Sequence, residues 1–164
     1  MRSALYLGIL LTIFLPAFFV GCTSSSDQPS AKVSAATVLT LITTDDPTGS
    51  FTDFESTLAK NLNKLSQPLH QIHRRIGSVN AFRAAIASTS QQHGLIDTLI
   101  LAFHGSPGSL RLGQRENLNQ RNLAAALDQV ESHLAEDAHV LLYACLTGAD
   151  DDNLAADLAT ALKC

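Results

Sequence analysis

The sequence predicts an α/β domain, a three-layer sandwich in which helices flank a mostly parallel sheet. Short apolar runs rich in β-branched residues alternate along the chain with amphipathic segments. These runs are apolar almost throughout, as expected for strands that are covered on both faces. The chain has 164 residues, of which 46% are hydrophobic and 16% charged. That balance fits one globular domain and excludes a disordered chain.

Three segments are predicted as buried strands by their length and residue types, namely Thr37–Thr43, Thr98–Phe103 and Ala138–Ala144. A fourth segment, Leu69–Ile76, is ambiguous and reads as a short strand in one interpretation. Strands in this order, each followed by a helical segment, favour parallel pairing with helices on both faces.

Four segments place apolar residues at helical spacing and are predicted as helices. Ser78 can cap the second of them, and Asp152 or Asn153 can cap the last. The apolar positions that predict the four helices are Phe51, Phe54, Leu58, Leu62 and Leu65; Val79, Phe82 and Ile86; Leu123, Leu127, Val130 and Leu134; and Leu154, Leu158 and Leu162.

The first 21 residues have the pattern of an export signal. Arg2 precedes an apolar run from Ala4 to Val20, which is also about long enough for the alternative of an uncleaved membrane anchor. The run ends in Phe19-Val20-Gly21-Cys22, which resembles the lipobox of bacterial lipoproteins. The resemblance implies a lipoprotein signal peptide over 1–21 and lipidation of Cys22, with palmitate among the acyl chains and the membrane as partner.

The residues after Cys22 divide into a tether and a domain. Residues 22–36 are Ser-rich and polar, typical of a flexible tether, and residues 37–164 form the α/β domain. By resemblance to lipoproteins we expect a lipid anchor in the bacterial cell envelope. Thr23 rather than Asp follows Cys22, which favours the outer membrane in a Gram-negative cell.

Composition excludes several classes of function. The net charge is −4 and no Lys/Arg cluster is present, which argues against nucleic acid as a partner. Three cysteines are too few for a disulfide scaffold. His70 and His73 would share a helix face, but no Cys or carboxylate stands at a matching spacing. We therefore expect no metal and no cofactor.

Two reactive side chains follow predicted strands directly. His104 comes after the strand that ends at Phe103, and Cys145 comes after the strand that ends at Ala144. One helix separates the two strands, so we expect them to be neighbours with both side chains at the carboxyl edge of the sheet. A thiol nucleophile needs such an imidazole. The amides of Gly105 and Cys145 would form an oxyanion hole.

Each of these residues also has a structural interpretation. His104 could hydrogen-bond a loop, and Cys145 could be a buried inert thiol. A disulfide with Cys164 is disfavoured, because the last helix would carry Cys164 to the opposite edge of the sheet. Ser106 and Ser109 lie near His104 but lack the Gly-x-Ser-x-Gly elbow of a serine nucleophile. The acidic runs 45–46 and 150–152 are interpreted as a turn and a solvated helix cap.

The two motifs resemble those of caspase-like cysteine peptidases, the group that includes caspases, gingipains, separases and CHAT domains. The segments that carry the resemblance are Phe103–Gly113 and Leu141–Gly148, each placed at a strand end. The similarity is greatest to a caspase-like domain of large bacterial surface proteins. It implies His104 as general base, Cys145 as nucleophile, and a peptide or protein substrate.

Caspase-type folds continue with two further strands beyond the helix that follows the nucleophile, whereas this sequence ends at Cys164. The substrate cleft would then be built otherwise, or a partner chain would complete it, or the chain is a truncated relic. The sequence therefore predicts a membrane-anchored cysteine endopeptidase, a hydrolase, with a non-catalytic envelope binding module or a relic of the fold as the alternative.

Overall fold

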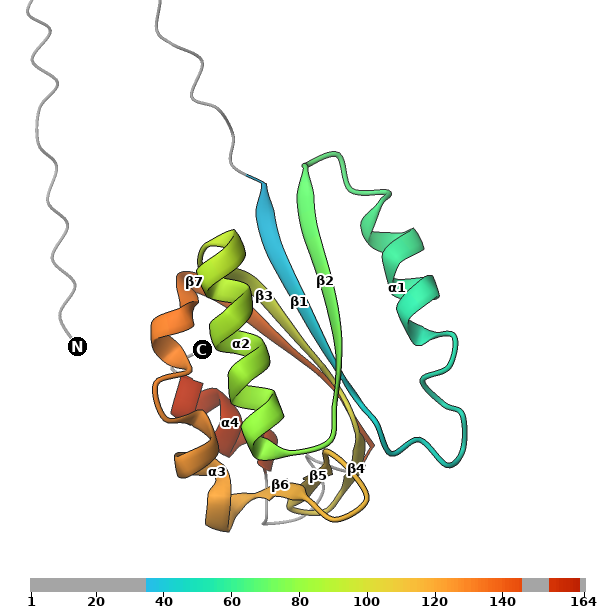
Figure 1. Cartoon of the computed structure of the whole chain (residues 1–164), viewed down its shortest axis with the longest axis vertical. Helices are drawn as coiled ribbons and strands as arrows, with labels where there is room; N and C mark the ends of the chain where they lie inside the picture. Colours follow the sequence, from blue (N-terminus) through green and yellow to red (C-terminus); the bar gives the residue numbers. More distant parts are fainter. Residues whose placement is uncertain (1–34, 146–153, 163–164) are drawn as a thin grey trace, which may run out of the picture. The chain divides into compact units, whose positions relative to one another are not determined.

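The fold is seen in a computed structural model that describes residues 35–145 and 154–162. Four parallel strands form the main sheet in the order β2-β1-β3-β7. The predicted α/β class with a mostly parallel sheet is therefore confirmed (Figure 1). The strands span Ala36–Thr43 (β1), Leu69–Ile76 (β2), Ile96–Ala102 (β3) and Leu134–Tyr143 (β7).

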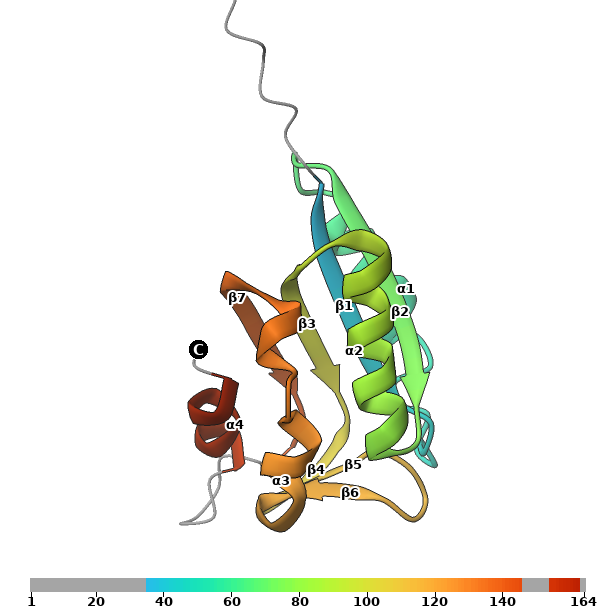
Figure 2. The ribbon, with the colours of Figure 1, turned by 60° about the vertical axis from the view of Figure 1, so that its left-hand side comes forward.

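The helices cover the two faces of this sheet unequally (Figures 1 and 2). They are α1 (Phe54–Leu62), α2 (Val79–His93), α3 (Gln120–Leu127) and α4 (Leu154–Leu162). Apolar residues of α2, α3 and α4 pack with Leu39 and Leu101 in the larger core. On the opposite face Phe54 of α1 packs against a smaller cluster that contains Ile42 and Ala102. The sheet thus lies between two helical layers.

Most predicted elements are observed with small shifts at their ends. β1 begins at Ala36, one residue before the predicted start of the domain. Leu69–Ile76, which the sequence left ambiguous, is an edge strand paired with β1. Ser78 caps α2 as predicted, because its side chain accepts a hydrogen bond from the Ala81 amide at 3.1 Å.

The prediction for the third helix was wrong beyond Leu127. The α3 helix ends there, and the chain continues through Gln129, whose φ of 64° breaks the helix. A single 3₁₀ turn, Glu131–His133, then leads into β7, which begins at Leu134. Val130 and Leu134 are both buried in the core, so the apolar spacing correctly indicated which residues are buried but wrongly predicted a helix there.

A small antiparallel sheet between β3 and α3 was not predicted. It consists of β4 (His104–Ser106), β5 (Ser109–Arg111) and β6 (Asn117–Asn119). Leu110 and Leu118 are completely buried and attach this sheet to the larger core. At Gly113 an added Cβ atom would lie 2.3 Å from the Gly77 carbonyl oxygen, so the connection between β5 and β6 packs directly on the end of β2.

The outer strand β7 is buried on one face only. Leu142 packs partly buried against the larger core, whereas Leu141 and Tyr143 are 52% and 63% exposed. By contrast, Thr37 through Thr43 of the central strand β1 are all buried. On the side of the sheet that Phe54 of α1 contacts, much of β7 is therefore left open.

Several predicted features lie outside the described residues: the signal peptide 1–21, Cys22, the tether as far as residue 34, the acidic run 150–152, Asn153 and Cys164. Within the described ranges, the helices lack the combination of length and hydropathy that a membrane span requires.

The uneven cover of β7 gives a testable difference between two leucines on neighbouring strands. We expect Leu101→Ala to lower the free energy of unfolding by about 2–5 kcal/mol, because Leu101 is fully buried. The matched variant Leu141→Ala should cost roughly 0.5 kcal/mol or less, because Leu141 is half exposed. Urea unfolding measures both, and equal losses would show that the outer face of β7 is covered in solution.

Candidate functional site

The pairing of β3 with β7 places the two predicted reactive residues at corresponding positions. Ala102 pairs with Tyr143 in the last pair of the ladder, and the Phe103 amide donates a hydrogen bond to the Tyr143 carbonyl oxygen at 3.1 Å. His104 and Cys145 each stand two residues beyond that pair. Because adjacent strands lie about 5 Å apart, this register keeps the two residues near one another at the carboxyl edge. The expectation that β3 and β7 are neighbours is confirmed.

His104 and Cys145 also line the same pocket, which has a volume of about 350 Å³. We call it the apolar pocket, because most of the side chains around it are aromatic or aliphatic. Cys145 is a free, exposed thiol, and the side chain of His104 is 26% exposed. The remaining lining residues are Ser50, Phe51, Phe103, Leu142, Tyr143 and Ala144.

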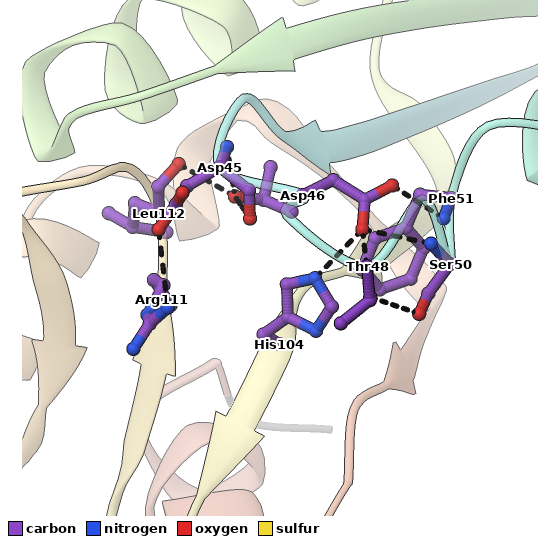
Figure 3. A network of polar contacts seen from close by, with 9 residues as sticks. Asp45, Asp46, Thr48, Ser50, Phe51, His104, Arg111 and Leu112 are labelled. Carbon is purple, nitrogen blue, oxygen red and sulfur yellow. Dashed lines mark hydrogen bonds and ion pairs between the residues drawn. The ribbon is translucent and has the colours of Figure 1, made fainter.

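Asp46 contacts the His104 ring at Nε2, the ring nitrogen farther from the His104 backbone (Figure 3). His104 Nε2 lies 2.9 Å from Asp46 Oδ1, a charge-assisted hydrogen bond if the ring donates. The other ring nitrogen, Nδ1, points away from Asp46 in the figure. With the Nε2 proton directed at the carboxylate, Nδ1 is the nitrogen left to accept a proton. The contact with Asp46 orients the ring, as a catalytic imidazole requires in addition to its contact with the nucleophile.

The Asp46 carboxylate is itself held by the turn that follows β1. Its Oδ1 accepts from the Ser50 amide at 2.9 Å, and its Oδ2 accepts from the Phe51 amide at 2.8 Å. Burial raises the pKa of Asp46, but the hydrogen bonds from Phe51, His104 and Ser50 outweigh that effect. The pKa of Asp46 therefore lies below its ordinary value of 3.8, and the carboxylate is charged at neutral pH.

Aromatic rings pack around this pair of residues. The Phe51 ring lies 5.0 Å from the His104 ring, measured between centroids, and 5.9 Å from the Phe54 ring. Phe54 in turn lies 5.0 Å from Tyr143 of β7. These contacts connect the turn after β1, the start of α1 and the end of β7, and they fix one face of the imidazole.

Two further contacts tie the turn after β1 to the small sheet. Thr43 Oγ1 donates to the Leu112 carbonyl oxygen at 3.1 Å, and this hydrogen bond is buried. Arg111 Nη1 lies 3.4 Å from Asp45 Oδ2. The polar network around His104 therefore joins three segments that are separate in the sequence: the end of β1 with its turn, His104 itself, and residues 111–112 (Figure 3).

A second pocket, of about 230 Å³, lies on the small-sheet side of His104. We call it the polar pocket. His104 lines both pockets, whereas Cys145 lines only the apolar one. The other lining residues of the polar pocket are Pro47, Thr48, Gly105, Ser106, Ser109, Arg111 and Asn117.

The structure places the remaining candidates as follows. Gly105, expected in the oxyanion hole, is in β4 opposite Leu110 and lines the polar pocket beside His104. Ser106 and Ser109 hydrogen-bond one another at 2.7 Å. His70 and His73 are on strand β2, so the helical spacing that a metal site would need is absent. Within the described residues, no group of three or more His, Cys, Asp or Glu side chains could hold a metal ion.

Sequence reasoning missed Asp46 and Arg111 as site residues. Asp46 was interpreted as a turn residue, and it does build the turn, but its buried carboxylate also faces His104. The loop after the first strand of a parallel sheet ends at the functional edge, and this position was the available signal. Arg111 lies on a strand of only three residues, which the pattern did not reveal.

The fold and the site define an α/β protein that carries an imidazole and a thiol at the carboxyl edge of a parallel sheet. Residues 54–163 match the family described as a domain of unknown function, DUF4347, and the chain belongs to that family. The matched range includes His104 and Cys145 and begins after Asp46.

The comparisons with curated proteins and with solved structures identify no further family. No curated protein matches the chain. Among solved structures, a variant short-chain dehydrogenase/reductase of Serratia marcescens is similar at 11% identity and a TM-score of 0.36. The match covers 78% of this chain and 63% of the dehydrogenase.

The lowered pKa of Asp46 predicts how stability depends on pH. A carboxylate whose pKa falls on folding stabilises the protein fully above its unfolded value, about 3.9, and loses that effect as the pH drops through the folded pKa. We expect Asp46→Asn to be less stable than the parent at pH 7, with the gap closing below about pH 4. Urea unfolding over that range measures the gap.

Asp53→Asn is the matched control for this prediction. Asp53 is exposed and its side chain forms no capping hydrogen bond, so the same loss of charge should leave stability nearly constant. A gap between the parent and Asp46→Asn that persists unchanged to about pH 2.5 would contradict the lowered pKa.

Proposed function

We propose that the protein is a cysteine peptidase, a hydrolase that cleaves peptide bonds through His104 and Cys145. The observation that carries the proposal is that both residues line one pocket, from paired strands in register, with His104 held by a buried carboxylate. An exposed thiol beside a fixed imidazole is the arrangement of an activated thiol nucleophile. The caspase-like resemblance of the two motifs supports the same function.

The reaction would proceed in two balanced steps. Cys145 Sγ gives its proton to His104 and attacks the peptide carbonyl carbon, forming a C–S bond. The C–N bond then breaks, His104 passes the proton to the leaving amine, and a thioester remains. Water gives a proton to His104 and attacks the thioester, and the departing Cys145 sulfur recovers that proton as the acid is released.

Gly105 and Asp46 have supporting roles in this scheme. The amides of Gly105 and Cys145 are proposed to bind the oxyanion that forms on the carbonyl oxygen when sulfur attacks the carbonyl carbon. Asp46 is a positioning residue, since it acts on the substrate only through His104. Its negative charge stabilises the imidazolium that forms when the ring takes the thiol proton.

We also propose that lipidated Cys22 anchors the protein in the bacterial cell envelope, in the outer membrane if the cell is Gram-negative. The sequence Phe19-Val20-Gly21-Cys22 after an apolar run supports the anchor, and the Ser-rich segment that follows would let the domain stand away from the membrane. The substrate is then a peptide or protein of the envelope.

The central test is the alkylation rate of Cys145 in the full chain, read peptide by peptide by mass spectrometry so that Cys22 and Cys164 are scored separately. We expect Cys145 to react faster than an unactivated exposed thiol at the same pH, because the His104 imidazole takes the thiol proton. His104→Ala should abolish that rapid reaction, and Asp46→Asn should slow it. His139→Ala, which removes an exposed imidazole, is the control.

Equal alkylation of Cys145 in the parent and in His104→Ala would overturn the peptidase proposal. The protein would then be studied as a non-catalytic binding module of the envelope, the alternative that the sequence left open. If Cys145 reacts rapidly in the parent but not in His104→Ala, a search for substrates with a peptide library is justified.

The anchor is tested independently of catalysis. We expect the protein to incorporate labelled palmitate when it is produced in a bacterium, and Cys22→Ser to abolish the incorporation because it removes the acceptor thiol. The Cys164→Ser variant removes another cysteine and should retain the label. Label that survives Cys22→Ser would contradict lipidation at this residue.

A further inference from the structure

We propose that the two pockets beside His104 are substrate subsites of opposite chemistry, and that the protein prefers to cleave after an apolar residue when an acidic residue follows in the leaving segment. This inference rests on the proposed peptidase function and adds the class of substrate. The apolar pocket takes the apolar side chain, and the polar pocket takes the carboxylate.

The chemistry of the polar pocket favours an anion. Arg111, Asn117, Ser106 and Ser109 carry hydrogen-bond donors, and among the residues that the structure describes neither Asp nor Glu lines the pocket. The guanidinium of an arginine can bind a carboxylate through two N–H groups at once. A carboxylate in this pocket would therefore meet several donors and, among the described lining residues, no like charge.

The ion pair of Arg111 with Asp45 leaves the positive partner accessible. The two groups meet through a single contact, Nη1 to Oδ2 at 3.4 Å, although a guanidinium has five N–H donors. The Arg111 side chain is 52% exposed, whereas that of Asp45 is 15% exposed. Arg111 lines the pocket and Asp45 does not. An incoming carboxylate therefore meets the cation of the pair first.

The apolar pocket has the opposite character. Phe51, Phe103, Leu142 and Tyr143 surround the space next to Cys145, and of the described lining residues only His104 can carry a positive charge. Pockets lined in this way bind apolar side chains because binding removes apolar surface from water. A charged side chain there would lose much of its hydration against walls that are mostly apolar.

The position of His104 between the pockets decides which side of the substrate enters which. Cys145 lines only the apolar pocket, so the acyl part of the substrate, which becomes bonded to sulfur, lies there. His104 must give its proton to the leaving amine, so the amine segment departs on the side of the imidazole. His104 borders the polar pocket, which therefore receives the leaving segment.

The test is peptide binding to the full chain carrying Cys145→Ala, which cannot turn the peptide over. Fluorescent peptides with Leu followed by Glu, at the first or second position after Leu, are compared with otherwise identical peptides that carry Gln or Lys. We expect one Glu peptide to bind about tenfold more tightly than its Gln counterpart, and the Lys peptide to bind most weakly.

Arg111→Gln, added to Cys145→Ala, should remove the preference for Glu over Gln, and Arg111→Lys should restore part of it. Arg115→Gln is the matched control, because Arg115 is an exposed arginine in the connection between β5 and β6 and lines neither pocket. It removes the same charge and should keep the preference. Replacement of Leu by Asp in the Glu peptide should weaken binding to all of these variants, because none of the arginine changes alters the apolar pocket.

The inference is overturned if no peptide binds, if Glu and Gln peptides bind equally, or if Arg115→Gln removes the preference as fully as Arg111→Gln. Its failure is distinguishable from failure of the proposed function. An Arg111-dependent preference for Glu in a parent protein that hydrolyses no peptide keeps the subsites and rejects the peptidase. Hydrolysis of peptides by the parent without that preference keeps the peptidase and rejects the subsites.

Discussion

The register in which β3 pairs with β7 is the constraint on which the candidate site depends. Leu99 and Leu101 of β3, and Val140 and Leu142 of β7, face the same helical layer, so burial of these side chains sets the pairing. A shift of one residue would turn the apolar side chains of one strand away from the core. The energy that fixes the core therefore also fixes where His104 and Cys145 stand at the sheet edge.

The polar part of the site depends on loops, but the loops are anchored in the core. Asp46 belongs to a turn whose own amides satisfy its carboxylate, and Thr43 fixes the start of that turn to the small sheet through a buried hydrogen bond. The small sheet is held by completely buried leucines. An imidazole supported in this way needs little reorganisation to accept a proton, which is the property that preorganised sites share.

The sequence alone predicted the parts of the fold that apolar patterning controls. The β3 and β7 strands, their adjacency, and the placement of His104 and Cys145 at their ends all followed from continuous apolar runs and the alternation of strands with helices. Strands of three residues are too short to show a period, which is why β4 to β6 were missed. The end of α3 was misplaced because Val130 stayed buried after the backbone had left the helix. The role of Asp46 is a tertiary contact across 58 positions, and no local pattern records it.

The light cover that α1 gives the sheet has a consequence for how the molecule opens. None of its nine residues is buried, although Phe54 packs against the small cluster beneath it. Segments that bury little apolar surface separate from a fold at a fraction of its global unfolding free energy. Hydrogen exchange in the native state should therefore reach the α1 amides long before those of α2, whose Phe82 and Ile86 are completely buried. Each such excursion separates the Phe54 ring from Phe51 and Tyr143, which both line the apolar pocket, so the packing of these two rings depends on the local stability of one weakly held helix.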